Sequence, residues 1–115
     1  MALNNAALGA AGAVLVTDLA YAQLHSAAAG GSGTSNLCSS SRVAVSWTNT
    51  NGTLTLASSL AFTGVAANGA VYSVTLWSAS TFGTFYGEFV LTGDATANSS
   101  GAYTVTSLTL TASAT

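Results

Sequence analysis

The sequence predicts a mostly β protein, a small antiparallel β-sandwich or partly closed barrel of six to seven strands with a short N-terminal helix. Short stretches of alternating apolar and polar residues recur from residue 42 onward, and turns containing Gly or Asn separate them at regular intervals. The length of 115 residues matches one domain with a single hydrophobic core. We therefore expect residues 1–115 to form one β-rich domain.

Residues 1–18 are expected to form an N-terminal helix or arm. Either residue of Asn4-Asn5 can cap a helix by accepting a backbone N–H bond. One apolar face at helical spacing is expected to comprise Leu8, Ala11 and Leu15. Gly9 and Gly12 each destabilise a helix by about 1 kcal/mol relative to Ala. The helix therefore needs packing partners.

Residues 19–25 predict a strand, with Leu19, Tyr21 and Gln23 on one face and Ala20, Ala22 and Leu24 on the other. Residues 27–41 are rich in Gly, Ser and Ala and predict a long surface loop. Loops longer than about 12 residues without secondary structure are usually functional or mobile. In an assembly, such a loop would serve as a docking arm.

The remainder of the chain is predicted to be strand and turn. Turns are expected at Asn51-Gly52, at Asn68-Gly69 and at residues 81–83, since Asn and Gly tolerate positive φ. Apolar residues change from odd positions (Tyr103 and Val105) to even positions (108 and 110) in the last strand. One face can stay buried through that change if an extra residue is inserted, so we expect a β-bulge near residues 106–107.

Charge is nearly absent from this chain. Only 3% of the residues are charged, against about 25% in an average soluble domain. These residues are Asp18, Arg42, Glu88 and Asp94. Without proline, and with so little charge, the edge strands lack the usual protection against pairing with another chain. We expect neighbouring subunits to cover much of the surface, in a homo-oligomer or a larger assembly.

Catalytic, metal-binding and nucleic-acid-binding patterns are missing from the sequence. His25 and Cys38 are the only imidazole and thiol, and no nucleophile motif surrounds either. Glu88 and Asp94 are a weak candidate for a glycosidase pair. A single Arg cannot supply the phosphate contacts that nucleic-acid affinity requires. We expect no enzyme activity, no catalytic residue, no cofactor, no metal and no nucleic-acid partner.

A membrane segment and a signal peptide are not expected. The longest apolar run, residues 10–16 with its neighbours, is far shorter than the roughly 20 residues that cross a bilayer. No basic segment precedes it. We expect no membrane partner and synthesis in the cytoplasm.

The aromatic side chains allow two interpretations. They fill small β-sandwich cores, and they also anchor interfaces or line sugar-binding surfaces. We expect Trp47 and Tyr72 in the core, and Trp77 or Tyr86 at an interface.

Five stretches together resemble one group of proteins. They are Gln23–Ala27, Arg42–Trp47, Val74–Ala79, Gly83–Gly87 and Gly101–Leu108. In this order, after an Ala-rich helix, they resemble short virion proteins of tailed phages and prophages, which are labelled tail-fibre or minor tail proteins. Similar small β proteins decorate capsids. The sequence departs from this pattern after Ala27, where Ala28-Ala29-Gly30 replaces an Asp-Pro-Gly turn and an acidic loop residue is missing. Loop contacts are therefore not carried over.

The resemblance implies a structural role in the virion, after assembly in the cytoplasm of the host bacterium. We expect a capsid decoration protein on the head that binds the major capsid protein or other virion proteins. The alternatives are a tail-tip, minor tail or tail-fibre protein, and a module that binds host-surface glycan. The candidate interface residues are Leu8, Leu15, Arg42, Trp77 and Tyr86.

Overall fold

The computed structural model describes residues 4–92 and 95–111 and confirms the mostly β class with one N-terminal helix. The described residues form nine strands, more than the six to seven expected. The chain is interrupted between residues 44 and 47 and between residues 105 and 109, where single strands were expected. The elements are α1 (Asn5–Asp18), β1 (Tyr21–His25), β2 (Val43–Ala44), β3 (Trp47–Thr50), β4 (Thr53–Leu56), β5 (Leu60–Phe62), β6 (Ser73–Trp77), β7 (Phe85–Val90), β8 (Tyr103–Val105) and β9 (Thr109–Thr111).

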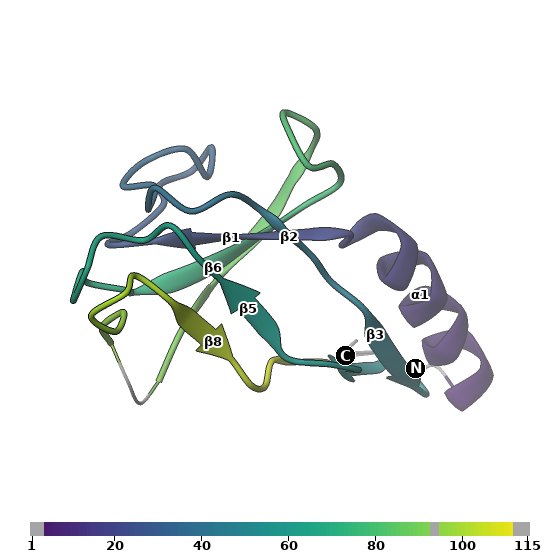
Figure 1. Ribbon diagram of the computed structural model, residues 1–115. Helices are drawn as coiled ribbons and strands as arrows, with labels where there is room; N and C mark the ends of the chain where they lie inside the picture. Colours follow the sequence, from purple (N-terminus) through teal and green to yellow (C-terminus); the bar gives the residue numbers. More distant parts are fainter. Residues whose placement is uncertain (1–3, 93–94, 112–115) are drawn as a thin grey trace.

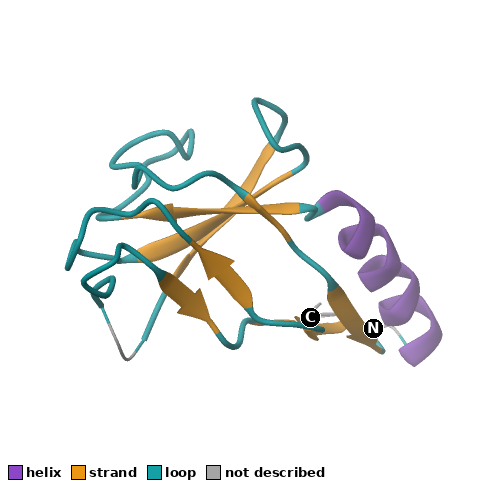
Figure 2. Ribbon diagram, in the orientation of Figure 1, coloured by secondary structure: helices purple, strands orange, loops and turns teal. Residues whose placement is uncertain are grey.

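The strands form three antiparallel sheets that do not close into a barrel. The strand orders are β2-β1-β6-β7, β3-β4-β9 and β5-β8. Helix α1 lies at one end of the molecule beside β3, and the two-stranded β5-β8 sheet lies toward the other end (Figure 1). Long loops rise from the four-stranded sheet on the side away from β8 (Figure 2). An open hollow of about 350 Å³ separates residues 89–92 from residues 103–109, so the sheets of β7 and β8 remain apart.

The core is centred on β1 and β6, the two inner strands of the four-stranded sheet. Ala22, Leu24, Val74 and Leu76 are at most 1% exposed. Trp47 also lies in the core, as the sequence predicts, and its indole Nε1 donates a hydrogen bond to Leu19 O at 2.9 Å. The β strands therefore surround one contiguous apolar cluster.

Helix α1 begins where the sequence predicts, but the residues that pack against the sheet are not all those expected. The Oδ1 of Asn4 accepts a hydrogen bond from Ala7 N at 2.9 Å and caps the helix. Gly12 is the buried residue of the helix, whereas Ala11, expected on the packed face, is exposed. A side chain on Gly12 would overlap the amide of Asn49. Glycine is therefore required where the helix meets β3.

The turn at Asn51-Gly52 forms as predicted. Asn51 has φ 51° and Gly52 has φ 91°, which is the geometry of a two-residue hairpin connection. This hairpin joins β3 to β4, and Asn49 Nδ2 links it to the helix by donating to Gly9 O at 2.9 Å. The hairpin thus holds α1 against the sheet.

The predicted β-bulge near residues 106–107 is wrong. The chain instead leaves the β5-β8 sheet after Val105 and joins the β3-β4-β9 sheet at Thr109. This change of sheet explains the change from odd to even buried positions. The register irregularity lies in β7, where Leu76 pairs with Gly87 but Trp77 pairs with Phe85, so that Tyr86 is an extra residue.

Candidate functional site

The loop predicted at residues 27–41 spans residues 26–42 and is anchored on the four-stranded sheet. It folds back over the four-stranded sheet, where Ala29 and Ser40 are buried. Gly33 approaches the ring of Phe85 so closely that a Cβ would overlap it, and its φ of 73° also favours glycine. The loop therefore covers the face of the sheet that is opposite the apolar core.

A carboxylate connects this loop to two strands. Glu88 Oε2 accepts hydrogen bonds from the Ser73 hydroxyl at 2.5 Å and from Ala29 N at 2.8 Å. The Ser73 bond is the main cause that lowers the pKa of Glu88 below its ordinary value, and partial burial opposes it. The ionised form of Glu88 therefore holds the loop on the sheet.

Beside this carboxylate lies a buried chain of hydrogen bonds. Trp77 Nε1 donates to Thr75 Oγ1 at 2.8 Å, and the same oxygen lies 2.8 Å from His25 Nε2. His25 Nδ1 lies 2.8 Å from the carbonyl oxygen of Ser35. Because a carbonyl only accepts, the proton on Nδ1 is donated to Ser35 O, and Nε2 is paired with the Thr75 hydroxyl.

The remaining chemically reactive groups do not gather into a recognisable site. His25 is 0% exposed and uses both ring nitrogens in the hydrogen bonds above. Cys38 lies 3.8 Å from Ala70 O, and burial raises the pKa of its thiol. Asp94, the partner imagined for Glu88, lies outside the described residues. Within residues 4–92 and 95–111, His, Cys, Asp and Glu form no group of three that could hold a metal.

Arg42 supports a short loop formed by residues 78–84, which we call the tip loop. The Arg42 Nη1 donates to Ala79 O at 2.8 Å and to Phe82 O at 2.7 Å, so one side chain spans the loop. The guanidinium lies 4.0 Å from the centroid of the Trp77 ring, in a cation–π arrangement. Trp77 in turn contacts Phe85, with ring centroids 5.3 Å apart.

This arrangement corrects two expectations about aromatic residues. Trp77 is only 5% exposed beneath Arg42, so its ring does not offer an interface. Tyr72, expected in the core, is 41% exposed. Tyr86 is exposed, because the irregularity in β7 turns it outward, and it remains a candidate interface residue.

The other candidate interface residues are Leu8 and Leu15 on the helix and Arg42, which supports the tip loop. Leu8 and Leu15 are half-buried, and Leu15 packs against the core of its own chain. Arg42 is half-buried and lines an open hollow of about 550 Å³ together with Gln23, Ser41 and residues 80–82. The structure therefore does not bring the five candidates into one patch.

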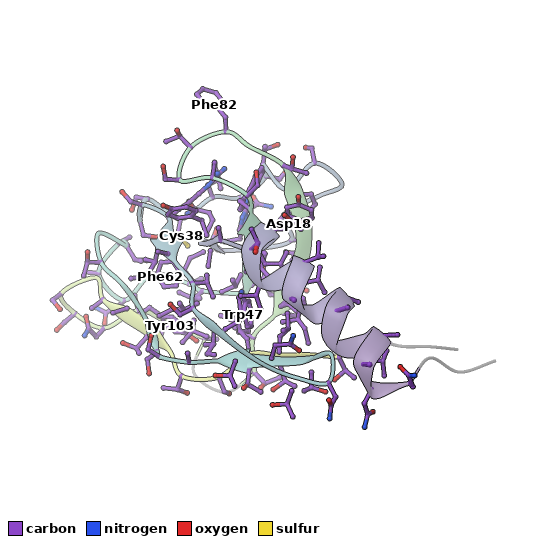
Figure 3. The ribbon with its side chains drawn as sticks, turned by 90° about the vertical axis from the view of Figure 1, so that its right-hand side faces the viewer. Asp18, Cys38, Trp47, Phe62, Phe82 and Tyr103 are labelled. Carbon is purple, nitrogen blue, oxygen red and sulfur yellow. The ribbon has the colours of Figure 1, made fainter. Side chains whose placement is uncertain are left out.

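Sequence reasoning missed the most exposed large apolar residue, Phe82, at 88% exposure. Phe82 lies at the outer end of the tip loop and points away from the body of the protein (Figure 3). Its φ of 55° is unusual for an aromatic residue. The signal available in the sequence was an apolar residue inside a predicted turn, directly before Gly83.

Comparisons with known proteins do not assign the chain to a family. No family model, no curated protein and no solved structure matches it. None of the described helices is both long enough and apolar enough to cross a membrane.

Proposed function

We propose that this chain is a non-enzymatic structural protein of a tailed-phage particle that decorates the head and stabilises its capsomers. The observation that carries this proposal is a nearly uncharged surface on a fold with open strand edges. The chain has four charged residues. The edge strands of its three sheets therefore carry little charge, although charge is what usually prevents an edge strand from pairing with another chain. Such edges are tolerated where neighbouring subunits cover them.

The helix supports the same proposal. Its exposed positions include Ala6, Ala10, Ala13 and Val14, so apolar residues surround it rather than forming one stripe. A helix that is apolar on all sides is typical of a buried environment. Because only one side of α1 faces its own sheets, a neighbour is expected to cover the rest.

Hydrogen bonds from polar groups beneath the loops hold the loops in fixed positions. Glu88, Ser73 and Ala29 N hold the 26–42 loop in place, and Arg42 holds the tip loop. Loops fixed in this way present the same surface in every copy, which suits a subunit that must bind repeated sites on a lattice. The resemblance to short virion proteins agrees with this interpretation.

The proposal is tested by adding the purified protein to heads from which it has been stripped. The expected result is a rise in the temperature at which the shell is disrupted, measured by calorimetry, with heat-unfolded protein as the control. An unchanged temperature would contradict head decoration. Labelled antibody that binds only the tail of intact particles would favour the tail alternative.

A further inference from the structure

Among the described residues, two charged groups lack a charged partner. Arg42 is its only Lys or Arg, and it forms no ion pair within the part of the chain that the structure describes. Its Nη1 bonds two carbonyls, so the N–H groups of Nη2 and Nε remain for another acceptor. The charge faces the 550 Å³ hollow beside the tip loop.

The opposite charge lies at an unfavourable position. Asp18 is the last residue of α1, where the helix dipole disfavours a carboxylate, and the last turn contains no basic residue. No hydrogen bond or ion pair to the Asp18 side chain is formed within residues 4–92 and 95–111. Asp18 is thus an uncommitted anion beside an apolar helix surface.

Each of these charges has an exposed apolar neighbour. Val14 is 60% exposed and precedes Asp18 by four residues, so both lie on one side of the helix about 6 Å apart along its axis. Phe82 is bonded through its carbonyl to Arg42, and its ring is the most exposed large apolar group. The tip loop and the helix therefore present matching pairs of one apolar group and one charge, opposite in sign.

We propose that the tip loop of one copy docks on helix α1 of a second copy. The Phe82 ring covers Val14 and the neighbouring alanines, and the Arg42 guanidinium binds the Asp18 carboxylate. The strained backbone at Phe82 is consistent with this role, because strained residues are retained where they bind.

Both halves of this contact lie at accessible places. The end of α1 that carries Asp18 is the end nearer to the tip loop, and Phe82 stands at the outer end of that loop (Figures 1 and 3). The tip loop and helix α1 are different surfaces of the same chain. Each copy therefore offers both surfaces, and association needs no second kind of protein. The proposal deepens the proposed function by naming one contact between copies, and it rests on that function only for its biological setting.

The test measures the mass of the purified full-length protein by sedimentation velocity across a range of concentrations. Two variants remove the contact without harming the fold. Phe82→Asn removes the ring and places Asn, which tolerates positive φ, at a position with φ 55°. Asp18→Asn removes the charge from an unfavourable helix end. Val90→Thr, at a 57% exposed residue of β7, is the matched control for an exposed apolar group.

The expected result is a wild-type oligomer that both variants weaken at least ten-fold in dissociation constant, with Val90→Thr unchanged. High salt should weaken the wild-type oligomer and should have a smaller effect on Asp18→Asn. A wild-type chain that stays monomeric up to about 1 mM would overturn the proposal. An oligomer that neither variant weakens would also overturn it, since the contact would then lie elsewhere.

A disulfide test locates the contact. In a Cys38→Ser background, Val14→Cys combined with Thr81→Cys should form linked dimers or longer ladders under mild oxidation, and each single cysteine variant should form few. The absence of links in the double variant would contradict the docking geometry. Monomeric protein that is nevertheless abundant on particles would refute this contact and leave the proposed function standing.

Discussion

Gly12 of α1 lies against the side-chain amide of Asn49 so closely that even one methyl group on Gly12 would overlap it. The amide cannot easily move, because Asn49 Nδ2 donates to Gly9 O and Asn49 Oδ1 accepts from Gly52 N. One side chain thus joins the helix to the hairpin. The position of the helix depends on the missing side chain at Gly12.

This contact gives opposite predictions for two glycines of the same helix. Gly12→Ala should destabilise the protein by about 1–3 kcal/mol through overpacking, although Ala favours helices. Gly9→Ala is the matched control, because its Cβ would make an ordinary contact of 3.9 Å with Asn51 Cα. Gly9→Ala should be neutral or stabilise by up to about 1 kcal/mol. Urea unfolding measures both, and equal effects of the two substitutions would contradict the packing described.

The hydroxyl of Thr75 is predicted to stabilise the buried face of the sheet. Thr75→Val keeps the shape but leaves Trp77 Nε1 and His25 Nε2 without their partner, which should lower the free energy of unfolding by about 1–3 kcal/mol. Thr75→Ser keeps the hydroxyl and is the control for the lost methyl group. If Val and Ser variants unfold at the same urea concentration, the hydrogen-bond chain has no stabilising role.

The free energy of unfolding is predicted to decrease in acid, because Glu88 becomes protonated. The pKa of Glu88 is lowered in the folded protein from its ordinary 4.5, first by the Ser73 hydroxyl and further by Ala29 N–H and His25, against partial burial. A carboxyl with a lowered folded pKa contributes stability that is fully present above pH about 4.5 and is lost as the pH falls through the folded pKa. The urea midpoint measured from neutral pH down to pH about 3 should therefore decrease.

The control for this pH dependence is Glu88→Gln, which cannot ionise. It should be less stable than the wild type at neutral pH and should lose less stability on acidification. A wild type and a Glu88→Gln variant with parallel pH profiles would show that other carboxyl groups cause the acid sensitivity.

Arg42 is predicted to protect the tip loop from proteolysis. Arg42→Lys keeps the charge, but it loses the planar guanidinium that stacks on the Trp77 ring and holds Nη1 between Ala79 O and Phe82 O. Chymotrypsin, which cleaves after aromatic residues, should cut after Phe82 faster in the Lys variant, as measured by mass spectrometry of the fragments. Equal cleavage rates would mean that the loop is held by the hydrogen bonds from Ser78 N to Thr84 O and from Thr84 N to Ser78 Oγ.

Local signals in the sequence predicted the parts of the fold that local physics decides. Asn4 caps the helix, Asn51-Gly52 turns the chain and Trp47 enters the core, because each depends on a few neighbouring residues. The odd-to-even change after Val105 was also recognised, but two explanations fit it. A bulge and a change of sheet produce the same pattern, and only the tertiary structure distinguishes them.

The candidate surface was harder to predict, because it depends on contacts between distant segments. Trp77 is covered by Arg42, which lies 35 residues earlier in the chain, and no local pattern shows that cover. The loop of residues 26–42 has the composition of a mobile arm, yet Glu88 binds it from a strand about 60 residues away. The exposure of Phe82 depends on the shape of the tip loop, and no local pattern in the sequence indicates that shape.

The proposed function makes this chain a repeated structural subunit of a virus particle. Its most direct test is the number of copies per purified particle, measured by quantitative protein staining against the major capsid protein. Head decoration predicts a ratio near one or a simple fraction such as one third, as sites on most capsomers require. A handful of copies would place the protein in the tail and contradict head decoration, and its absence from the particle would contradict the virion role altogether.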